Sequence, residues 1–230
     1  MNGVAIVTGG TGALGQAITL RLLRDGAAVA VPWVVATEHE ALVARVPADH
    51  RRRLLLAEAD VTEPASMADF ARLVVGRFAE VNMLVTTVGG FAGGGLMQTD
   101  LGTWNSMLTL NLTSTFVAAR AVVPWMRSAR YGRIVTIASR AVVPPPPGIL
   151  AYTVAKTGVI ALTQSLAAEL KPDGITVNAI LPSTMDTPAN RAAMPDVDPK
   201  SWVPVDSVAD AVAFLVRRDS GHITGTLLAI

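Results

Sequence analysis

The sequence predicts an α/β fold, a single doubly wound parallel sheet with helices on both faces. Short apolar runs alternate along the whole chain with longer stretches of helical periodicity, and a glycine-rich segment separates the first run from the first helical stretch. Strands that alternate with helices form parallel sheets, because each right-handed crossover lays a helix on one face. With 230 residues, the chain fits one domain that spans residues 1–230.

Composition excludes several classes of function. The chain is 51% hydrophobic and 16% charged with a net charge of +1, so we expect neither disorder nor a nucleic-acid partner. It has no cysteine, which excludes disulfides, thiol catalysis and cysteine-ligated zinc. The three histidines have no metal-ligand spacing, so we predict no metal site. No secretory signal or membrane-length apolar run is present, which favours a cytoplasmic protein without a membrane partner.

The first strand is predicted at residues 4–8, an apolar run that ends in glycine. The loop after it reads Thr-Gly-Gly-Thr-Gly-Ala-Leu-Gly, and a helix follows at residues 16–24. Glycines let a backbone approach a pyrophosphate closely, and the helix N-terminus offers N–H groups and a positive dipole end. The order predicts a Rossmann-type sheet whose dinucleotide-binding loop contains Gly9, Thr11, Gly12, Ala13, Leu14 and Gly15.

The second strand, at residues 27–31, is followed by Trp33 rather than by an acidic residue. An acid at this point binds the ribose hydroxyls in many NAD enzymes. Trp33 is expected to pack against either the adenine or the core. Glu38 and Glu40 are interpreted as surface charges on a helix at residues 38–45. The absence of a lysine or arginine here slightly favours NAD over NADP.

The middle of the chain continues the alternation. We expect strands at residues 53–57 and 83–85, with a helix at residues 64–79 between them. A long helix is predicted at residues 100–126. Asn111 lies inside it, although asparagine competes with the backbone for hydrogen bonds and is a poor helix-interior residue. Asn111 therefore requires a local explanation.

The stretch from Ser139 to Lys156 carries the chemistry. A strand at residues 132–138 leads into Ser139, which could hydrogen-bond a substrate oxygen as charge develops there. On a helix at residues 151–170, Tyr152 and Lys156 stand one turn apart on one face. An ammonium beside a phenol lowers the pKa of the phenol, and a tyrosine tuned in this way can act as general acid or base.

The last part of the chain completes the sheet and covers the site. Strands are expected at residues 175–181 and 223–228, with a helix at residues 206–217 between them. The proline-containing segment at about 182–205 is predicted to form a substrate lid.

Ser139, Tyr152 and Lys156 together resemble the Ser and Tyr-x-x-x-Lys signature of the short-chain dehydrogenase/reductase family. The glycine loop and the lid are similar to those of dihydropteridine reductases, a divergent branch of that family. The resemblance implies that Asn111 supports a proton relay and that Lys156 binds the nicotinamide ribose. It implies cofactor contacts for residues across the chain: Asp60, Val61, Gly89, Tyr152, Pro182, Thr184 and Thr187.

The activity implied is hydride transfer between NAD or NADP and a small carbonyl or alcohol substrate, with Tyr152 as the acid or base. Pterin reduction is an alternative, although Ser139 and Asn111 favour the catalytic set of carbonyl reductases. A second alternative is a dinucleotide-sensing protein without catalysis. Members of this family are usually homodimers or homotetramers built through the two long helices.

Overall fold

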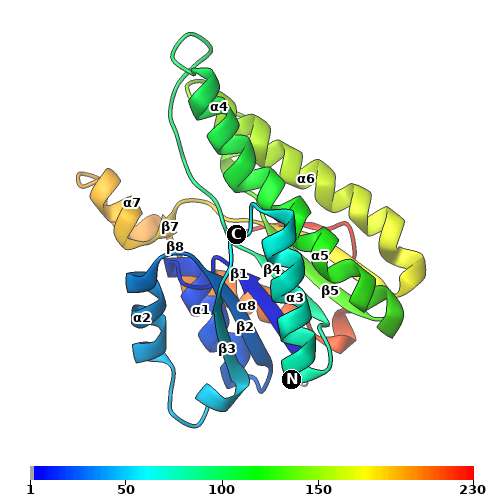
Figure 1. Cartoon of the computed structure of the whole chain (residues 1–230). Helices are drawn as coiled ribbons and strands as arrows, with labels where there is room; N and C mark the ends of the chain where they lie inside the picture. The colour runs from blue at the N-terminus through cyan, green and yellow to red at the C-terminus, as the bar shows by residue number, and fades with distance from the viewer. Residues whose placement is uncertain (1–2) are drawn as a thin grey trace.

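The computed structural model describes residues 3–230 and contains one sheet of seven parallel strands. Their order is β3-β2-β1-β4-β5-β6-β9 (Figure 1). Successive strands are added on one side of β1 as far as β3 and on its other side from β4 onward, so the strand order reverses between β1 and β4. The strands are β1 (Val4–Thr8), β2 (Ala28–Trp33), β3 (Leu54–Glu58), β4 (Met83–Thr86), β5 (Gly132–Ile137), β6 (Ile175–Leu181) and β9 (Leu227–Ala229). The predicted doubly wound parallel fold is confirmed.

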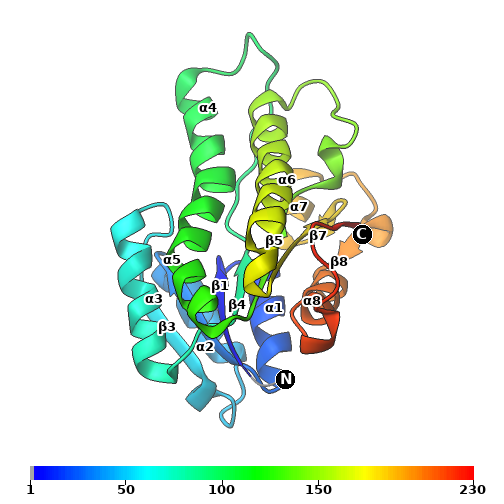
Figure 2. The same ribbon diagram turned by 90° about the vertical axis from the view of Figure 1, so that its right-hand side faces the viewer.

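Helices cover both faces of this sheet (Figures 1 and 2). One face carries α1 (Ala13–Arg24), α8 (Val205–Leu215) and, through its buried Leu42, α2 (Ala36–Arg45). The other face carries α3 (Pro64–Phe78), α5 (Ser114–Ala129) and α6 (Leu150–Leu170). The central strands β1, β5 and β6 are buried along their whole length, as expected for a parallel sheet covered on both faces, although β5 and β6 also contain buried polar residues such as Arg133 and Asn178.

The predicted long helix consists of three consecutive pieces. α4 (Leu101–Leu108) leads into a π-helical turn (Thr109–Thr113) and then into α5. α4 and α6 extend together past the edge of the sheet (Figure 1). The 29 residues from Leu101 to Ala129 are long and apolar enough to cross a membrane, and 44% of the most apolar window is buried in the fold. A single helix of this kind is weak evidence for a membrane span, because core helices pass the same test.

Two strand boundaries differ from the sequence prediction by more than one residue. β2 continues to Trp33 through Pro32, which the sheet tolerates because β1 pairs with β2 only as far as Ala30. The last strand begins at Leu227, so the prediction of a strand from residue 223 was wrong. There the Asn178 amide donates to the Ile223 carbonyl (2.9 Å) and accepts from the Thr226 N–H (3.1 Å). Backbone bonds to β6 are already present at Gly225 and Thr226, but Gly225 has φ of +75° and so interrupts the extended backbone.

Between β6 and α8 the chain forms a small separate unit. β7 (Met185–Asp186) pairs with β8 (Val203–Pro204), and α7 (Pro188–Ala193) lies between them. Thr187 caps α7 by accepting a hydrogen bond from the Asn190 N–H (3.2 Å). Short 3₁₀ turns occur at Arg51–Arg53, Arg140–Val142, Lys171–Asp173, Pro199–Ser201 and Arg218–Ser220.

Candidate active site

The four side chains predicted to be catalytic meet at the carboxyl edge of the sheet, beyond β4 and β5. Gly89, which follows β4, brings two of them together. A Cβ added there would lie 2.7 Å from Asn111 Oδ1 and 3.4 Å from Lys156 Nζ. Ser139 follows the end of β5, and its hydroxyl lies near enough to Tyr152 to lower the pKa of that phenol. In parallel α/β sheets this edge, at the point where the strand order reverses, is the usual place for a ligand.

Ser139 lies in the segment that connects β5 to α6. Its hydroxyl accepts a hydrogen bond from the Ala141 N–H (3.2 Å) and so caps the short turn at Arg140–Val142. The same hydroxyl lies near the phenol of Tyr152 and lowers the pKa of that phenol, against the larger opposite effect of burial. Two hydroxyl groups on neighbouring segments can therefore donate hydrogen bonds to one carbonyl oxygen.

Lys156 lies one helical turn after Tyr152 and is only 6% exposed. Its ammonium donates to the carbonyl of Ile137, the last residue of β5, at 2.8 Å. Burial lowers the pKa of Lys156 from 10.5 to about 8. The lysine therefore connects α6 to β5 and titrates closer to neutral pH than an exposed lysine.

The prediction that the Lys156 ammonium lowers the pKa of the Tyr152 phenol below its ordinary value was wrong for this structure. Burial raises the pKa of the Tyr152 phenol above 10, and the hydrogen bond from Ser139 only partly opposes this. The reason is desolvation, since a phenolate loses its hydration when the ring is covered. The Lys156 ammonium is directed to the Ile137 carbonyl.

Asn111 explains the irregular turn of the long helix. It lies in the π-helical turn and is 1% exposed. Its Nδ2 donates to the carbonyls of Gly90 (3.1 Å) and Met107 (3.0 Å), and its Oδ1 accepts from the Gly90 N–H (3.2 Å). The asparagine thus fixes the loop after β4, and the helix is distorted at this position.

The glycine loop between β1 and α1 packs tightly against itself. Gly9 has φ of +69°, a conformation that side chains rarely adopt. A Cβ on Gly15 would lie 2.0 Å from the Gly9 carbonyl oxygen, so helix α1 approaches the loop closely. The loop backbone is further held by Gln16, whose amide donates to the Thr11 carbonyl (2.6 Å).

The space above this loop suits a pyrophosphate. Gly12 is the N-cap of α1, and a Cβ there would meet only the Gly9 oxygen, at 3.5 Å. Within residues 3–230, no side chain caps the helix and its first turn contains no acid. The N–H groups of the first turn, at Ala13, Leu14 and Gly15, therefore lie at an uncapped positive helix end. These residues fit a dinucleotide.

Glu38 is exposed on α2, as interpreted from the sequence, but it also contacts the glycine loop, which was not predicted. The Thr11 hydroxyl donates to Glu38 Oε2 at 2.9 Å. A signal existed, because an acid about 20 residues after such a loop is typical of ribose recognition. Trp33 is half-buried, and its ring lies 4.7 Å from the ring of His39 on α2, so it stacks at the surface rather than filling the core.

Asp60 and Val61 lie past the end of β3. The Asp60 carboxylate accepts from the N–H (2.8 Å) and hydroxyl (2.7 Å) of Thr62, and the Asp60 N–H donates to Ser66 Oγ (3.0 Å). These bonds close a local turn at the start of α3, while Val61 is buried beside that helix. In this structure the Asp60 carboxylate therefore hydrogen-bonds within its own turn.

Pro182 and Thr184 connect β6 to the small unit that contains α7. The Pro182 carbonyl accepts from the Arg140 N–H (3.0 Å), and the Thr184 carbonyl accepts from the Val203 N–H (2.8 Å). The segment therefore begins beside the turn that carries Ser139. The buried Thr187 hydroxyl is occupied as the cap of α7.

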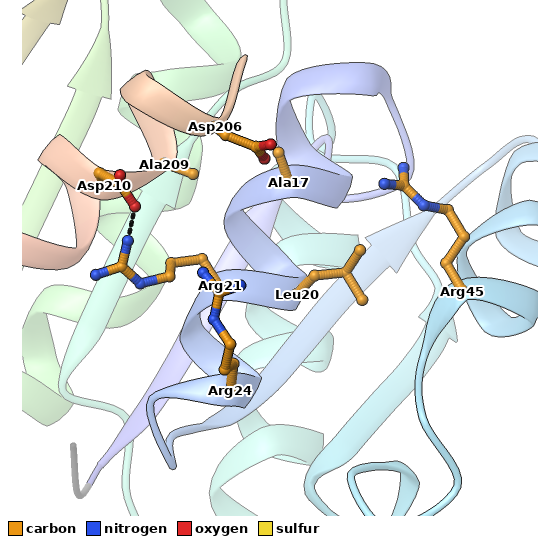
Figure 3. Close-up of a pocket in the computed structure, with 8 residues that line it drawn as sticks. All are labelled: Ala17, Leu20, Arg21, Arg24, Arg45, Asp206, Ala209 and Asp210. Atoms are coloured by element: carbon orange, nitrogen blue, oxygen red, sulfur yellow. Dashed lines mark ion pairs between the residues drawn. The ribbon is translucent and has the colours of Figure 1, made fainter. Parts of the chain in front are cut away.

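Two surface pockets lie away from these residues. One, of about 210 Å³, is lined by α1, α8 and Arg45, with Arg21 paired to Asp210 (Figure 3). It is smaller than typical ligand pockets of about 300–1,000 Å³. The other is lined by residues that include Asn82 and Tyr131, which precede β4 and β5, so it opens at the opposite edge of the sheet from Ser139. Neither contains the catalytic candidates.

The chain belongs to the short-chain dehydrogenase family, because the family model described as short chain dehydrogenase matches residues 3–198. It is 33% identical to (2S)-[(R)-hydroxy(phenyl)methyl]succinyl-CoA dehydrogenase subunit of Thauera aromatica, over 100% of this chain and 95% of that protein. It is 32% identical to 3-oxoacyl-[acyl-carrier-protein] reductase of Escherichia coli (strain K12), over 99% and 95% of the two chains. Like these relatives, it is an oxidoreductase.

Solved structures share the whole fold. An NAD⁺-bound xylitol dehydrogenase superposes with a TM-score of 0.89 at 29% identity, covering 99% of this chain and 97% of that one. Levodione reductase superposes with a TM-score of 0.91 at 25% identity, covering 99% and 95%.

Proposed function

We propose that this enzyme transfers a hydride between NAD and a carbonyl or alcohol carbon, with Tyr152 as general acid or base. The observation that carries the proposal is the placement of the Ser139 hydroxyl near the Tyr152 phenol, one helical turn from the buried Lys156. A bound nicotinamide dinucleotide supplies the hydride for reduction and accepts it in oxidation. The names of both cited relatives contain a hydroxy or oxo group as part of the substrate.

Each residue has a defined task in this proposal. Ser139 and Tyr152 hold the carbonyl oxygen, and in reduction the oxygen takes the Tyr152 proton as the carbon gains the hydride. The ketone becomes an alcohol while the dinucleotide is oxidised. Lys156 holds the ribose of the nicotinamide, and Asn111 keeps the loop after β4 in place.

The residues proposed from the sequence would hold the cofactor as follows. Gly12 and the first turn of α1 would bind the pyrophosphate, and Trp33, Asp60 and Val61 would contact the adenosine. Gly89, Pro182, Thr184 and Thr187 would contact the nicotinamide. Residues 182–205 act as the lid over this single domain.

NAD is favoured over NADP because of Glu38. Its carboxylate lies 2.9 Å from the Thr11 hydroxyl, beside the loop that would hold the adenosine half. A carboxylate can accept a hydrogen bond from a ribose hydroxyl, whereas it repels the 2′-phosphate of NADP.

The proposal includes a homo-oligomer and a cytoplasmic location. Apolar side chains on the two long helices, Phe116 and Trp125 on α5 and Val154 on α6, are exposed in the single chain. Large apolar groups on a monomer surface favour contact with a second copy. Light scattering should give the mass of a dimer or tetramer, and a monomer would contradict this part of the proposal.

Fluorescence titration with NADH and NADPH, followed by ketone-dependent NADH oxidation, tests the proposed activity. Tyr152→Phe should bind NADH normally but lose turnover by about 10²-fold or more. Tyr131→Phe, at the opposite edge of the sheet, is the matched control and should remain active. Binding of neither nucleotide would overturn the proposal.

Pterin reduction is the alternative activity, and nucleotide sensing is the alternative without catalysis. A pterin reductase would tolerate Ser139→Ala, whereas a ketone reductase would be crippled by it. A sensor would bind the dinucleotide but turn over neither ketones nor quinonoid dihydropterin. Undiminished ketone turnover in Ser139→Ala would count against the proposed role of that hydroxyl.

A further inference from the structure

Phe91 lies directly against the side chain proposed as general acid or base. Its ring centroid is 5.1 Å from that of Tyr152, with an angle of 67° between the rings, which is an edge-to-face contact. Nevertheless, Phe91 is 67% exposed. The rest of the ring therefore faces open space beside the Tyr152 ring.

The position of Phe91 is fixed on both sides. Asn111 binds both the N–H and the carbonyl of Gly90, immediately before it. Three residues after it, Gly94 forms an isolated β-bridge with Ile149, just ahead of α6. In this bridge the Gly94 N–H donates to the Gly148 carbonyl (2.7 Å) and the Leu150 N–H donates to the Gly94 carbonyl (3.0 Å). A glycine-rich segment is thus held in one place, and Phe91 with it.

The chain around Phe91 is apolar. Residues 88–99 and residues 141–155, the two segments joined by the Gly94–Ile149 bridge, contain no acidic or basic side chain. Leu96 and Met97 in the first segment and Val143 in the second are exposed. No side chain in these two segments can form an ion pair with a charged group on the substrate. Their exposed apolar side chains instead favour contact with a flat apolar group.

We propose that Phe91 is a specificity-determining wall of the substrate site and selects carbonyl compounds with an aryl group next to the reacting carbon. This inference rests on the proposed function. When Ser139 and Tyr152 hold the carbonyl oxygen, a ring attached to the carbonyl carbon lies within reach of the open part of Phe91. Aromatic pairs prefer edge-to-face or offset contacts, so an aryl ketone gains more there than a saturated ring of similar size.

The test compares acetophenone with cyclohexyl methyl ketone, two ketones that differ in the aromaticity of one ring. The wild-type enzyme with NADH should prefer acetophenone. Phe91→Leu should reduce kcat/KM for acetophenone relative to cyclohexyl methyl ketone by about tenfold, chiefly through KM, as expected from the loss of an aromatic pair. Phe214→Leu replaces another half-exposed phenylalanine, on α8, and should leave the ratio unchanged.

The possible failures are distinguishable. If Phe91→Leu leaves the ratio of kcat/KM for the two ketones unchanged, whether or not both values fall, the role of Phe91 is overturned and the proposed function remains intact. If the wild-type enzyme reduces neither ketone nor any other carbonyl compound, both proposals fall. Circular dichroism shows whether Phe91→Leu is folded, so that a lost aromatic contact can be told from unfolding. Phe91→Tyr keeps the aromatic ring and should retain the preference for acetophenone.

Discussion

The buried ammonium of Lys156 donates a hydrogen bond to the carbonyl oxygen of Ile137, at a distance of 2.8 Å. This bond connects α6 to the last residue of β5, immediately before the turn that carries Ser139. It positions Tyr152, one helical turn away, relative to the strand. A cation that is buried with a neutral partner also makes the stability of the protein depend on pH.

Lys156→Met should remove that pH dependence. The pKa of Lys156 is about 8 in the folded protein, against 10.5 as its ordinary value, so between these pH values the unfolded chain binds more protons. Unfolding free energy of the wild type should therefore rise with pH across this window, by about 3 kcal/mol relative to Lys156→Met. Urea unfolding of both proteins from pH 7 to pH 10.5 measures how the difference in unfolding free energy changes with pH. A constant difference between the two would contradict the lowered pKa.

Ser139→Ala should change both the rate and its pH dependence. Burial raises the pKa of Tyr152 and the Ser139 hydrogen bond lowers it, so the variant should have a still higher pKa. Alcohol oxidation needs the phenolate, and its alkaline rise in kcat/KM should move to higher pH. The lost donor should also reduce kcat by about 10²-fold.

The control for this prediction is Ser128→Ala, which alters an exposed serine on α5. Its pH profile should match that of the wild type. If Ser139→Ala is slow but its alkaline rise is unshifted, the hydroxyl orients substrate without influencing Tyr152.

Asn111→Ala should destabilise the protein and loosen the loop after β4. The substitution leaves the N–H and carbonyl of Gly90 without their side-chain partner, at a cost of about 1–3 kcal/mol. Asn105→Ala, at an exposed position on α4, should change stability by less than about 0.5 kcal/mol. Thermal unfolding compares the two variants. Equal effects would mean that the Gly90 contact adds nothing to stability.

The fold and the centre of the site were predictable because they depend on local patterns. Buried parallel strands leave continuous apolar runs, and Tyr152 and Lys156 share a helix face whatever surrounds them. The irregular turn could be anticipated from Asn111 alone, since a buried amide inside a helix needs partners that an ordinary turn does not supply.

What the sequence did not reveal depends on contacts between distant segments. The raised pKa of Tyr152 results from burial, which no residue spacing reports. The last strand begins late because Gly225, with φ of +75°, interrupts the extended backbone, while the Asn178 side chain, 45 residues from Ile223, binds the Ile223 carbonyl. Glu38 was interpreted as a surface charge because its approach to Thr11 depends on how α2 packs beside the glycine loop.

Glu38 gives a prediction about cofactor choice. Glu38→Gln keeps the size of the side chain and removes the charge beside Thr11, so it should tighten NADPH binding relative to NADH by about tenfold. Glu40→Gln removes an exposed charge two residues further along α2 and is the matched control, for which we expect no change. Fluorescence titrations of both variants with both dinucleotides measure the ratio. If the two substitutions change it equally, general charge around the site rather than the carboxylate at Thr11 determines the preference.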